Sequence, residues 1–261
     1  MNHFKILWTF CIYNEIELLP YKIDYMAKNG IDTYIFDNMS TDGSWEWLQK
    51  HKIPAERFNS DGMFNLVLNM KLVEDKIHQL KPGWAILSGA DIFYTHLAHK
   101  NLREAIENID QSGYNAVNSG FRAFNFRYTE SPEEILGKNK DPRLVYKYYT
   151  EDVVKDTCIA KYCPGLKIAG DHFIVPNQKT YKNNNLIFLH YCFRHDAKLR
   201  KTEQYQRRKK AWDAGKTPIG WGRHYKRMVE NNSFVRDKNA LHCVEDNQTI
   251  FYKIKESIQH G

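Results

Sequence analysis

The sequence predicts an α/β protein with a mostly parallel central sheet flanked by helices and a basic, partly helical C-terminal extension. Short apolar runs alternate with helical patterns through the first half of the chain, as they do in parallel sheets. Polar, turn-forming clusters follow three of these runs, where the carboxyl ends of the strands would lie. With 42% hydrophobic and 26% charged residues among 261, the composition is that of a globular protein.

Each element of the first half has its own signals. Strands are expected where short apolar runs lie between turn residues, over 4–12, 31–36, 53–58, 84–87 and 115–118. Helices are expected where apolar residues recur every three or four positions, over 15–29, 44–50, 63–80 and 99–109. Gly30, Pro82-Gly83 and Gly113 end three of these helices.

The second half is less regular. After residue 121 the chain is aromatic and rich in arginine until about residue 150. Late strands are expected over 168–175 and 186–190, and a helix after residue 196. Because no linker is visible, we expect residues 1–195 to form the main domain and residues 196–261 to be an extension packed on it.

Cysteine usage and the N-terminal segment predict a cytoplasmic protein. The five cysteines are an odd number without metal-ligand spacing, which is typical of ordinary thiols in a reducing compartment. The N-terminal apolar run is interrupted by Lys5 and has no small-residue cleavage site, so it predicts a strand rather than a signal peptide.

The net charge of +7 is concentrated in one segment. Residues 198–227 contain eleven Lys or Arg against two carboxylates, which leaves the rest of the chain at −2. A solvated helix face accounts for this segment without any partner. Peripheral contact with an anionic membrane or a lipid-diphosphate acceptor is the second interpretation. Nucleic-acid binding is the weakest, because no nucleic-acid module accompanies the segment.

Three polar clusters follow predicted strands, namely Asn14-Glu15, Asp37-Asn38 and Asp91. Each has a structural alternative, since Asn14 is a good helix N-cap and residues 37–42 are good turn formers. Their occurrence at successive strand ends favours one shared pocket.

The clusters belong to a set of motifs that occur in a particular order. The motifs are Tyr13-Asn14-Glu15, Phe36-Asp37-Asn38-x-Ser40-x-Asp42-Gly43-Ser44, Trp84-x-x-x-x-Gly89-x-Asp91-x-Phe93, and His190-Tyr191-x-x-Arg194 followed by Glu203 and Lys209. The set resembles glycosyltransferase family 2, whose members have the GT-A nucleotide-sugar-binding fold. The resemblance covers roughly residues 4–95, with a weaker likeness at 165–210.

The resemblance implies inverting transfer of a sugar from a nucleotide-diphosphate donor to an acceptor hydroxyl of a cell-surface or capsular glycan. It implies that residues 1–195 bind the donor and catalyse the transfer. The acceptor would be a glycan or a lipid-linked molecule, and the reaction would take place in the cytoplasm or at the inner membrane face. A divalent cation, Mn²⁺ or Mg²⁺, would neutralise the leaving diphosphate. The donor-binding residues implied are Tyr13, Asn14, Glu15, Asp37, Asn38, Asn69, Gly89, Ala90, Asp91 and Arg194.

The resemblance makes Asp91 the metal ligand and His190 the second metal or diphosphate ligand. His190 also suits a satisfied core position, and Arg194 a surface position. The motif departs from the family because Gly89 replaces the first Asp of Asp-x-Asp and Ile92 replaces the usual Glu. Two alternatives follow: phosphate charge carried by Lys or Arg with little need for metal, or a non-catalytic nucleotide-sugar-binding relative.

Inverting transfer needs a general base for the acceptor hydroxyl. Asp171 is the first candidate and His172 the competing one, because both lie at the start of a predicted late strand. Glu133 and Glu134 are set aside, since Ser131-Pro132-Glu133-Glu134 has the pattern of a helix capping box.

Overall fold

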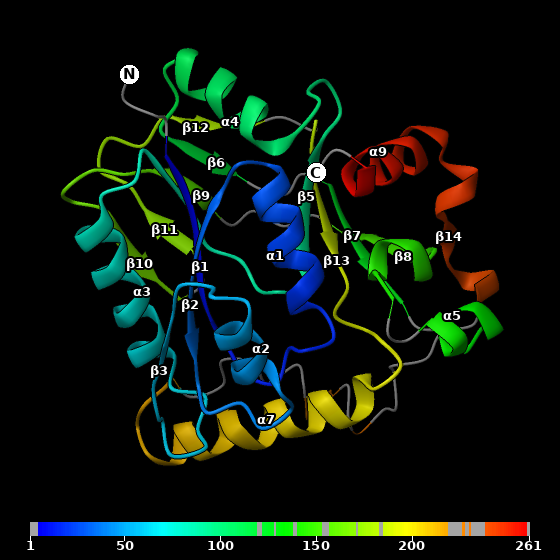
Figure 1. Cartoon of the computed structure of the whole chain (residues 1–261), viewed down its shortest axis with the longest axis horizontal. Coiled ribbons are helices and arrows are strands. Elements are labelled where there is room, and N and C mark those ends of the chain that lie inside the picture. The colour runs from blue at the N-terminus through cyan, green and yellow to red at the C-terminus, as the bar shows by residue number, and fades with distance from the viewer. Residues whose placement is uncertain are drawn as a thin grey trace.

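The computed structural model describes residues 5–118, 122–127, 129–137, 140–152, 157–170, 172–182, 185–218, 226–227, 230 and 238–259. Its centre is a sheet of strand order β12-β6-β9-β4-β1-β2-β3 (Figure 1). Among these described strands only β9 runs against its neighbours, which confirms the predicted mostly parallel sheet. The strands are β1 (Ile6–Ile12), β2 (Asp32–Asp37), β3 (Ala55–Arg57), β4 (Trp84–Ile86), β6 (Ala116–Asn118), β9 (Thr157–Lys161) and β12 (Thr180–Tyr181).

Helices cover both faces of this sheet, as predicted. One face carries α1 (Leu19–Lys28), α2 (Ser44–Lys50) and α4 (Leu102–Gln111), and their buried residues share a core cluster with Trp8 and Trp84. The other face carries α3 (Leu66–Leu80), whose inward side chains Met70, Val73 and Ile77 pack with Leu7. The arrangement is consistent with a GT-A-like fold.

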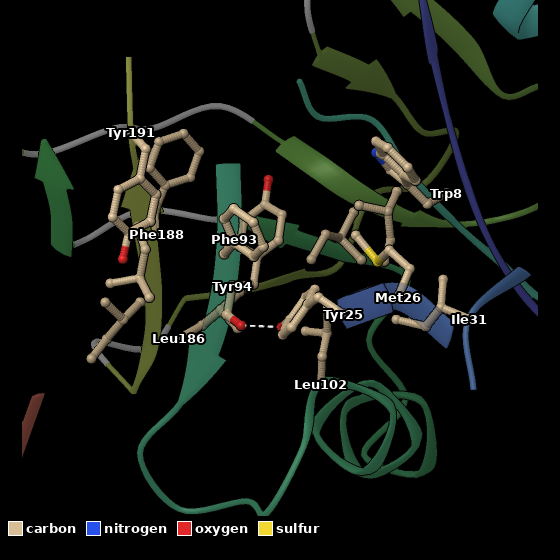
Figure 2. Packing of buried hydrophobic residues seen from close by; sticks show 14 of the residues in the cluster. Trp8, Tyr25, Met26, Ile31, Phe93, Tyr94, Leu102, Leu186, Phe188 and Tyr191 are labelled. Atoms are coloured by element: carbon tan, nitrogen blue, oxygen red, sulfur yellow. Dashed lines mark hydrogen bonds between the residues drawn. The ribbon is translucent and has the colours of Figure 1, made fainter. Parts of the chain in front are cut away.

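A second sheet extends the first core cluster. Its order is β14-β8-β7-β13-β5, and its strands are β5 (Ile92–His96), β7 (Arg122–Phe126), β8 (Tyr148–Asp152), β13 (Leu186–His190) and β14 (His242–Cys243). Figure 2 shows Phe93 and Tyr94 of β5 between Phe188 of β13 and Tyr25 of α1, with the Tyr25 hydroxyl donating to the Tyr94 carbonyl. Asp91 lies in the turn between β4 and β5, which we call the Asp91 turn. Because β5 directly follows this turn, the second sheet helps to position it.

The remaining elements are shorter or peripheral. They are α5 (Pro132–Gly137), α6 (Pro142–Val145), β10 (Lys167–Ala169), β11 (His172–Ile174), α7 (Ala197–Asp213) and α9 (Gln248–Gln259), with short 3-10 turns at Lys238–Ala240 and Val244–Asp246. All five cysteines are free. Within the described residues, no helix combines the length and apolar character needed to cross a membrane.

One helix boundary and one late strand differ from the prediction. The helix expected over 15–29 begins only at Leu19, because Pro20 occupies its first turn and the preceding amides bond to side chains of the 40–44 loop. The strand expected over 168–175 is instead the antiparallel hairpin β10–β11, because Gly170 has φ +68° and turns the chain back.

Candidate functional site

Asp91 and His190 meet at one edge of the central sheet. Asp91 lies in the turn between β4 and β5, and His190 ends β13, the antiparallel partner of β5. The His190 Nε2 atom is 3.4 Å from Asp91 Oδ2, and the Tyr191 amide donates to the Asp91 carbonyl at 2.8 Å. The two residues that the sequence proposes as metal ligands are therefore neighbours.

The orientation of the His190 ring is determined by Asn125 of β7. The Nδ1 atom of His190 lies 3.0 Å from Asn125 Oδ1. Because an amide oxygen only accepts, Nδ1 donates to Asn125, and the Nε2 atom of the ring faces Asp91. An outer hydrogen bond of this kind is typical of metal-binding histidines. Asn125 was not predicted as a site residue, since it lies in the irregular aromatic region after residue 121.

The Asp91 carboxyl and the His190 imidazole stabilise each other's charged forms. Burial alone would raise the pKa of Asp91, but the charge and hydrogen bond of His190, with the charges of Lys201 and Arg194, lower it below its usual range. Burial alone would lower the pKa of His190, but the Cys192 and Asp91 side chains raise it to about 10. Asp91 and His190 therefore form an ion pair, to which the charge of Lys201 is added.

Gly89 gives the Asp91 carboxylate its place. A Cβ atom at position 89 would lie 2.6 Å from Asp91 Oδ1, well inside van der Waals contact. The carboxylate thus occupies the space that a side chain at 89 would need. The glycine that replaces the first Asp of Asp-x-Asp therefore leaves room for the Asp91 carboxylate. Ala90, between the two, is buried in the same turn.

Glu15 connects the end of β1 to α7. It pairs with Arg200 at 2.5 Å and with Arg194 at 3.5 Å, while Arg200 also donates to the Asn14 carbonyl. Arg194 is 1% exposed and pairs with Glu17 at 3.1 Å, so its expected alternative as a surface residue is wrong. Burial raises the pKa of Glu15, and the two arginines oppose that shift.

The loop after β2 binds the loop after β1. Ser40 Oγ accepts from the Asn14 amide and Ser44 Oγ from the Glu15 amide, and Asn14 Oδ1 accepts from Thr41 N in return. Asn14 has φ 55° and lies before the helix start, so it is no N-cap. These hydrogen bonds connect the carboxyl ends of β1 and β2. The two clusters predicted after these strands therefore lie next to each other.

Asp37 and Asn38 differ in what they leave free. Asp37 Oδ2 accepts from Arg57 at 3.0 Å and from Ser40 N at 3.1 Å, whereas its buried Oδ1 has no hydrogen-bond partner among the described residues. Asn38 is occupied by Ser60, with which it exchanges hydrogen bonds of 2.8 and 2.9 Å. Asp37 therefore keeps an acceptor for a ligand, and Asn38 mainly holds the chain after β3.

Asn69 and Tyr13 line the same edge. Asn69, on α3, is buried next to Cys11, and its Oδ1 has no partner within the described part of the chain. The Tyr13 hydroxyl donates to Glu203 at 2.8 Å, and the Arg207 guanidinium lies 3.4 Å from the Tyr13 ring centroid. Both partners of Tyr13 come from α7, which runs across this edge in Figure 1.

The inward face of α7 is cationic, which the sequence did not reveal. Arg200, Lys201, Arg207 and Arg208 recur at helical spacing and are buried or partly buried. Lys198, Lys209 and Lys210 are exposed. Four of the eleven basic residues of the segment are therefore buried or partly buried rather than exposed. A signal existed, since the inward positions follow the helical period, but arginine and lysine are ordinarily assigned to solvent.

The general-base candidates are not brought to Asp91 by any described contact. Asp171 lies outside the described residues. His172 begins β11 in a hairpin that is tied to α3 by a 2.6 Å hydrogen bond from Ile168 N to Glu74. The role of either residue stays a prediction. Glu134 and Ser131 do form the predicted capping box, with hydrogen bonds of 3.3 and 3.4 Å.

No protein-family model and no curated protein matches the chain. Solved structures of S. aureus TarS do. TarS 1–349 is 12% identical over 98% of this chain and 80% of its own, with a TM-score of 0.42. The complex of TarS 1–349 with UDP-GlcNAc is 14% identical over 50% of this chain and 38% of its own, with a TM-score of 0.36. A further TarS structure is 16% identical over 50% of this chain and 23% of its own, with a TM-score of 0.37.

Proposed function

We propose that this chain is a glycosyltransferase that moves a sugar from a nucleotide-diphosphate donor to an acceptor hydroxyl, with inversion. The observation that carries the proposal is the meeting of Asp91 and His190 at 3.4 Å. The two residues come from motifs 99 positions apart, and each motif resembles the corresponding glycosyltransferase motif. The acceptor we propose is a cell-surface or capsular glycan, free or lipid-linked.

The residues present fit a divalent cation. Asp91 offers a carboxylate oxygen, and His190 offers the Nε2 atom that faces it once the proton on that atom is released, at a separation that two ligands of one ion can have. One carboxylate completed by donor phosphates and water is a common way to hold Mg²⁺, and Mn²⁺ accepts similar ligands. Such an ion would neutralise the diphosphate as it leaves.

The chain's own side chains supply the rest of the donor site. Asp37 Oδ1 is a buried acceptor without a described partner, suited to a base N–H or a ribose hydroxyl. Lys201 is buried, and its charge reaches Asp91, so it contributes positive charge where the diphosphate would lie. We assign the proton-accepting role to Asp171 or His172.

Thermal unfolding with nucleotide diphosphates tests the proposal. The uridine, guanosine and thymidine diphosphates are each added once in the presence of Mn²⁺ and once in the presence of a chelator. A ligand at ~100 times its Kd stabilises by about 2.7 kcal/mol, a shift of a few degrees. A base-selective shift that needs Mn²⁺ supports the proposal, and Asp91→Ala should remove it. A chain that responds to none of the three would have no donor site.

We also propose that the reaction takes place in the cytoplasm, near the membrane. The free cysteines suit a reducing compartment, and the exposed lysines of α7 suit an anionic surface.

A further inference from the structure

Lys22 is a lysine with no exposed surface. It lies on the inward side of α1, and its Nζ atom is 5.0 Å from the ring centroid of Trp8, 5.2 Å from Phe93, 5.7 Å from Tyr25 and 5.9 Å from Tyr94. Figure 2 shows Phe93 and Tyr94 of β5 facing Tyr25 of α1. Lysine is almost never fully buried unless it has a partner.

The partners of Lys22 are the two ends of the Asp91 turn. Its Nζ donates to the Ile92 carbonyl and, at 3.5 Å, to the Ser88 hydroxyl. The Trp8 indole adds a 2.9 Å hydrogen bond to the Ser88 carbonyl. One side chain from α1 thus links the residue before Gly89 to the residue after Asp91.

Packing alone does not account for a lysine here. Lys22 forms no ion pair with a carboxylate of the described residues, and burial lowers its pKa, against which the charge of Asp91 acts. An apolar chain of similar length, such as methionine, would fill the same aromatic box without the cost of burying an amine. What methionine lacks is the hydrogen bonds to the turn.

We propose that Lys22 is a positioning residue for the candidate site: by bonding Ser88 and Ile92 it holds the turn that presents the Asp91 carboxylate to a cation and to the donor diphosphate. The identity of the cation and of the donor diphosphate rests on the proposed function. That Lys22 holds the turn rests on the hydrogen bonds to Ser88 and Ile92 described above. Lys22 acts through the turn and touches no substrate.

The test compares Lys22→Met with Lys28→Met, the same change on the same helix at a half-exposed lysine paired with Asp24. The first readout needs no ligand: hydrogen exchange of the Tyr191 amide, which donates to the Asp91 carbonyl. We expect exchange about tenfold faster in Lys22→Met and unchanged in Lys28→Met. The Asn38 amide donates to the Ile12 carbonyl, between the ends of β1 and β2, and serves as a control for general loosening of the fold. Its exchange rate should be unchanged in both variants.

An unchanged Tyr191 amide in folded Lys22→Met would overturn the proposal. If Lys22→Met does not fold, Ser88→Ala decides the matter, because it removes one acceptor and leaves the aromatic box intact. Faster Tyr191 exchange in Ser88→Ala supports the proposal, and wild-type exchange contradicts it.

The second readout is affinity for Mn²⁺ alone, measured from the signal of the free ion. Loss of a residue that orients a metal ligand typically weakens binding by 10–100-fold, and we expect about tenfold in Lys22→Met. If the wild-type chain binds no Mn²⁺, the proposed metal site fails, while Tyr191 exchange still decides whether Lys22 holds the turn.

Discussion

At the residue scale, replacing Gly89 tests whether the Asp91 site is complete with a glycine at 89 or has lost a metal ligand there. Because a Cβ at 89 would lie 2.6 Å from Asp91 Oδ1, adding the family's aspartate should displace the existing ligand rather than restore a second one. We expect Gly89→Ala and Gly89→Asp both to weaken Mn²⁺ binding by about tenfold. Titration with Mn²⁺ measures this. Tighter binding by Gly89→Asp would instead mean that Gly89 marks a lost ligand.

His96 makes a prediction about pH. It is 2% exposed, and its Nδ1 accepts from the Ala98 amide at 3.1 Å. Burial first, then the charges of His99 and Lys253, lower its pKa to about 4. Since the unfolded value is ~6.5, the unfolded chain binds the proton more tightly.

His96 should have no effect on stability above pH ~6.5, should lower it progressively as the pH drops from ~6.5 to 4, and should leave that loss constant below pH 4. The full effect is about 3 kcal/mol. Urea unfolding of wild type and His96→Asn, which keeps an acceptor near Nδ1, measures the difference between the two curves. Parallel curves from pH 7 to 4 would refute the assignment.

Single residues also show how far sequence reasoning reaches. Asp91 and His190 were predicted as partners because their motifs resemble those of a known family. Lys22 was invisible, although it lies on the face of α1 defined by Leu19, Ile23 and Met26, because a lysine on an apolar face is ordinarily assigned to the boundary with solvent. Burial of a charge depends on distant partners, and a sequence pattern does not contain them.

At the element scale, α7 binds the carboxyl edge of the sheet through its inward arginines. Arg207 is buried, lies over Tyr13 at 3.4 Å and donates to the Met63 carbonyl at 3.1 Å. We expect Arg207→Ala to destabilise the chain by about 2 kcal/mol, through lost cation–π and hydrogen-bond contacts.

Lys209→Ala is the matched control, because Lys209 lies on the same helix, faces solvent and pairs with the exposed Asp213 at 2.7 Å. Its Tm should stay at the wild-type value, since an exposed pair contributes little. Thermal unfolding of both variants checks the contrast. Equal Tm values for the two would mean that α7 does not depend on its inward face.

Elements with local signals were predictable, and those defined by distant pairing were not. The range 186–190 was predicted from its apolar run and is β13. β7 and β8 were missed, because the alternation of Phe124, Asn125, Phe126 and Arg127 is short and β7 pairs with β13, some sixty residues away. Gly170 was a local signal for the β10–β11 turn that the longer apolar run concealed.

At the scale of the whole molecule, the net charge of +7 does not describe the surface of α7. Arg200, Lys201, Arg207 and Arg208 serve the interior and the candidate site, so that helix offers a membrane mainly Lys198, Lys209 and Lys210. Three lysines give a weak attraction to anionic lipid, which salt screens over ~8–10 Å at physiological strength.

We therefore expect binding to phosphatidylserine vesicles at low salt, its loss near ~0.15 M salt, and none to phosphatidylcholine. Vesicle sedimentation measures all three. Replacing Lys198, Lys209 and Lys210 by Gln should abolish the low-salt binding and leave the Tm unchanged, since all three are exposed. Binding that survives this triple change would point to the other exposed basic residues of the segment, Lys216, Lys226 and Arg227, and after them to the exposed Leu199 and Leu136. Absence of binding at low salt would refute the predicted membrane contact, because a lysine-based attraction is strongest where it is least screened.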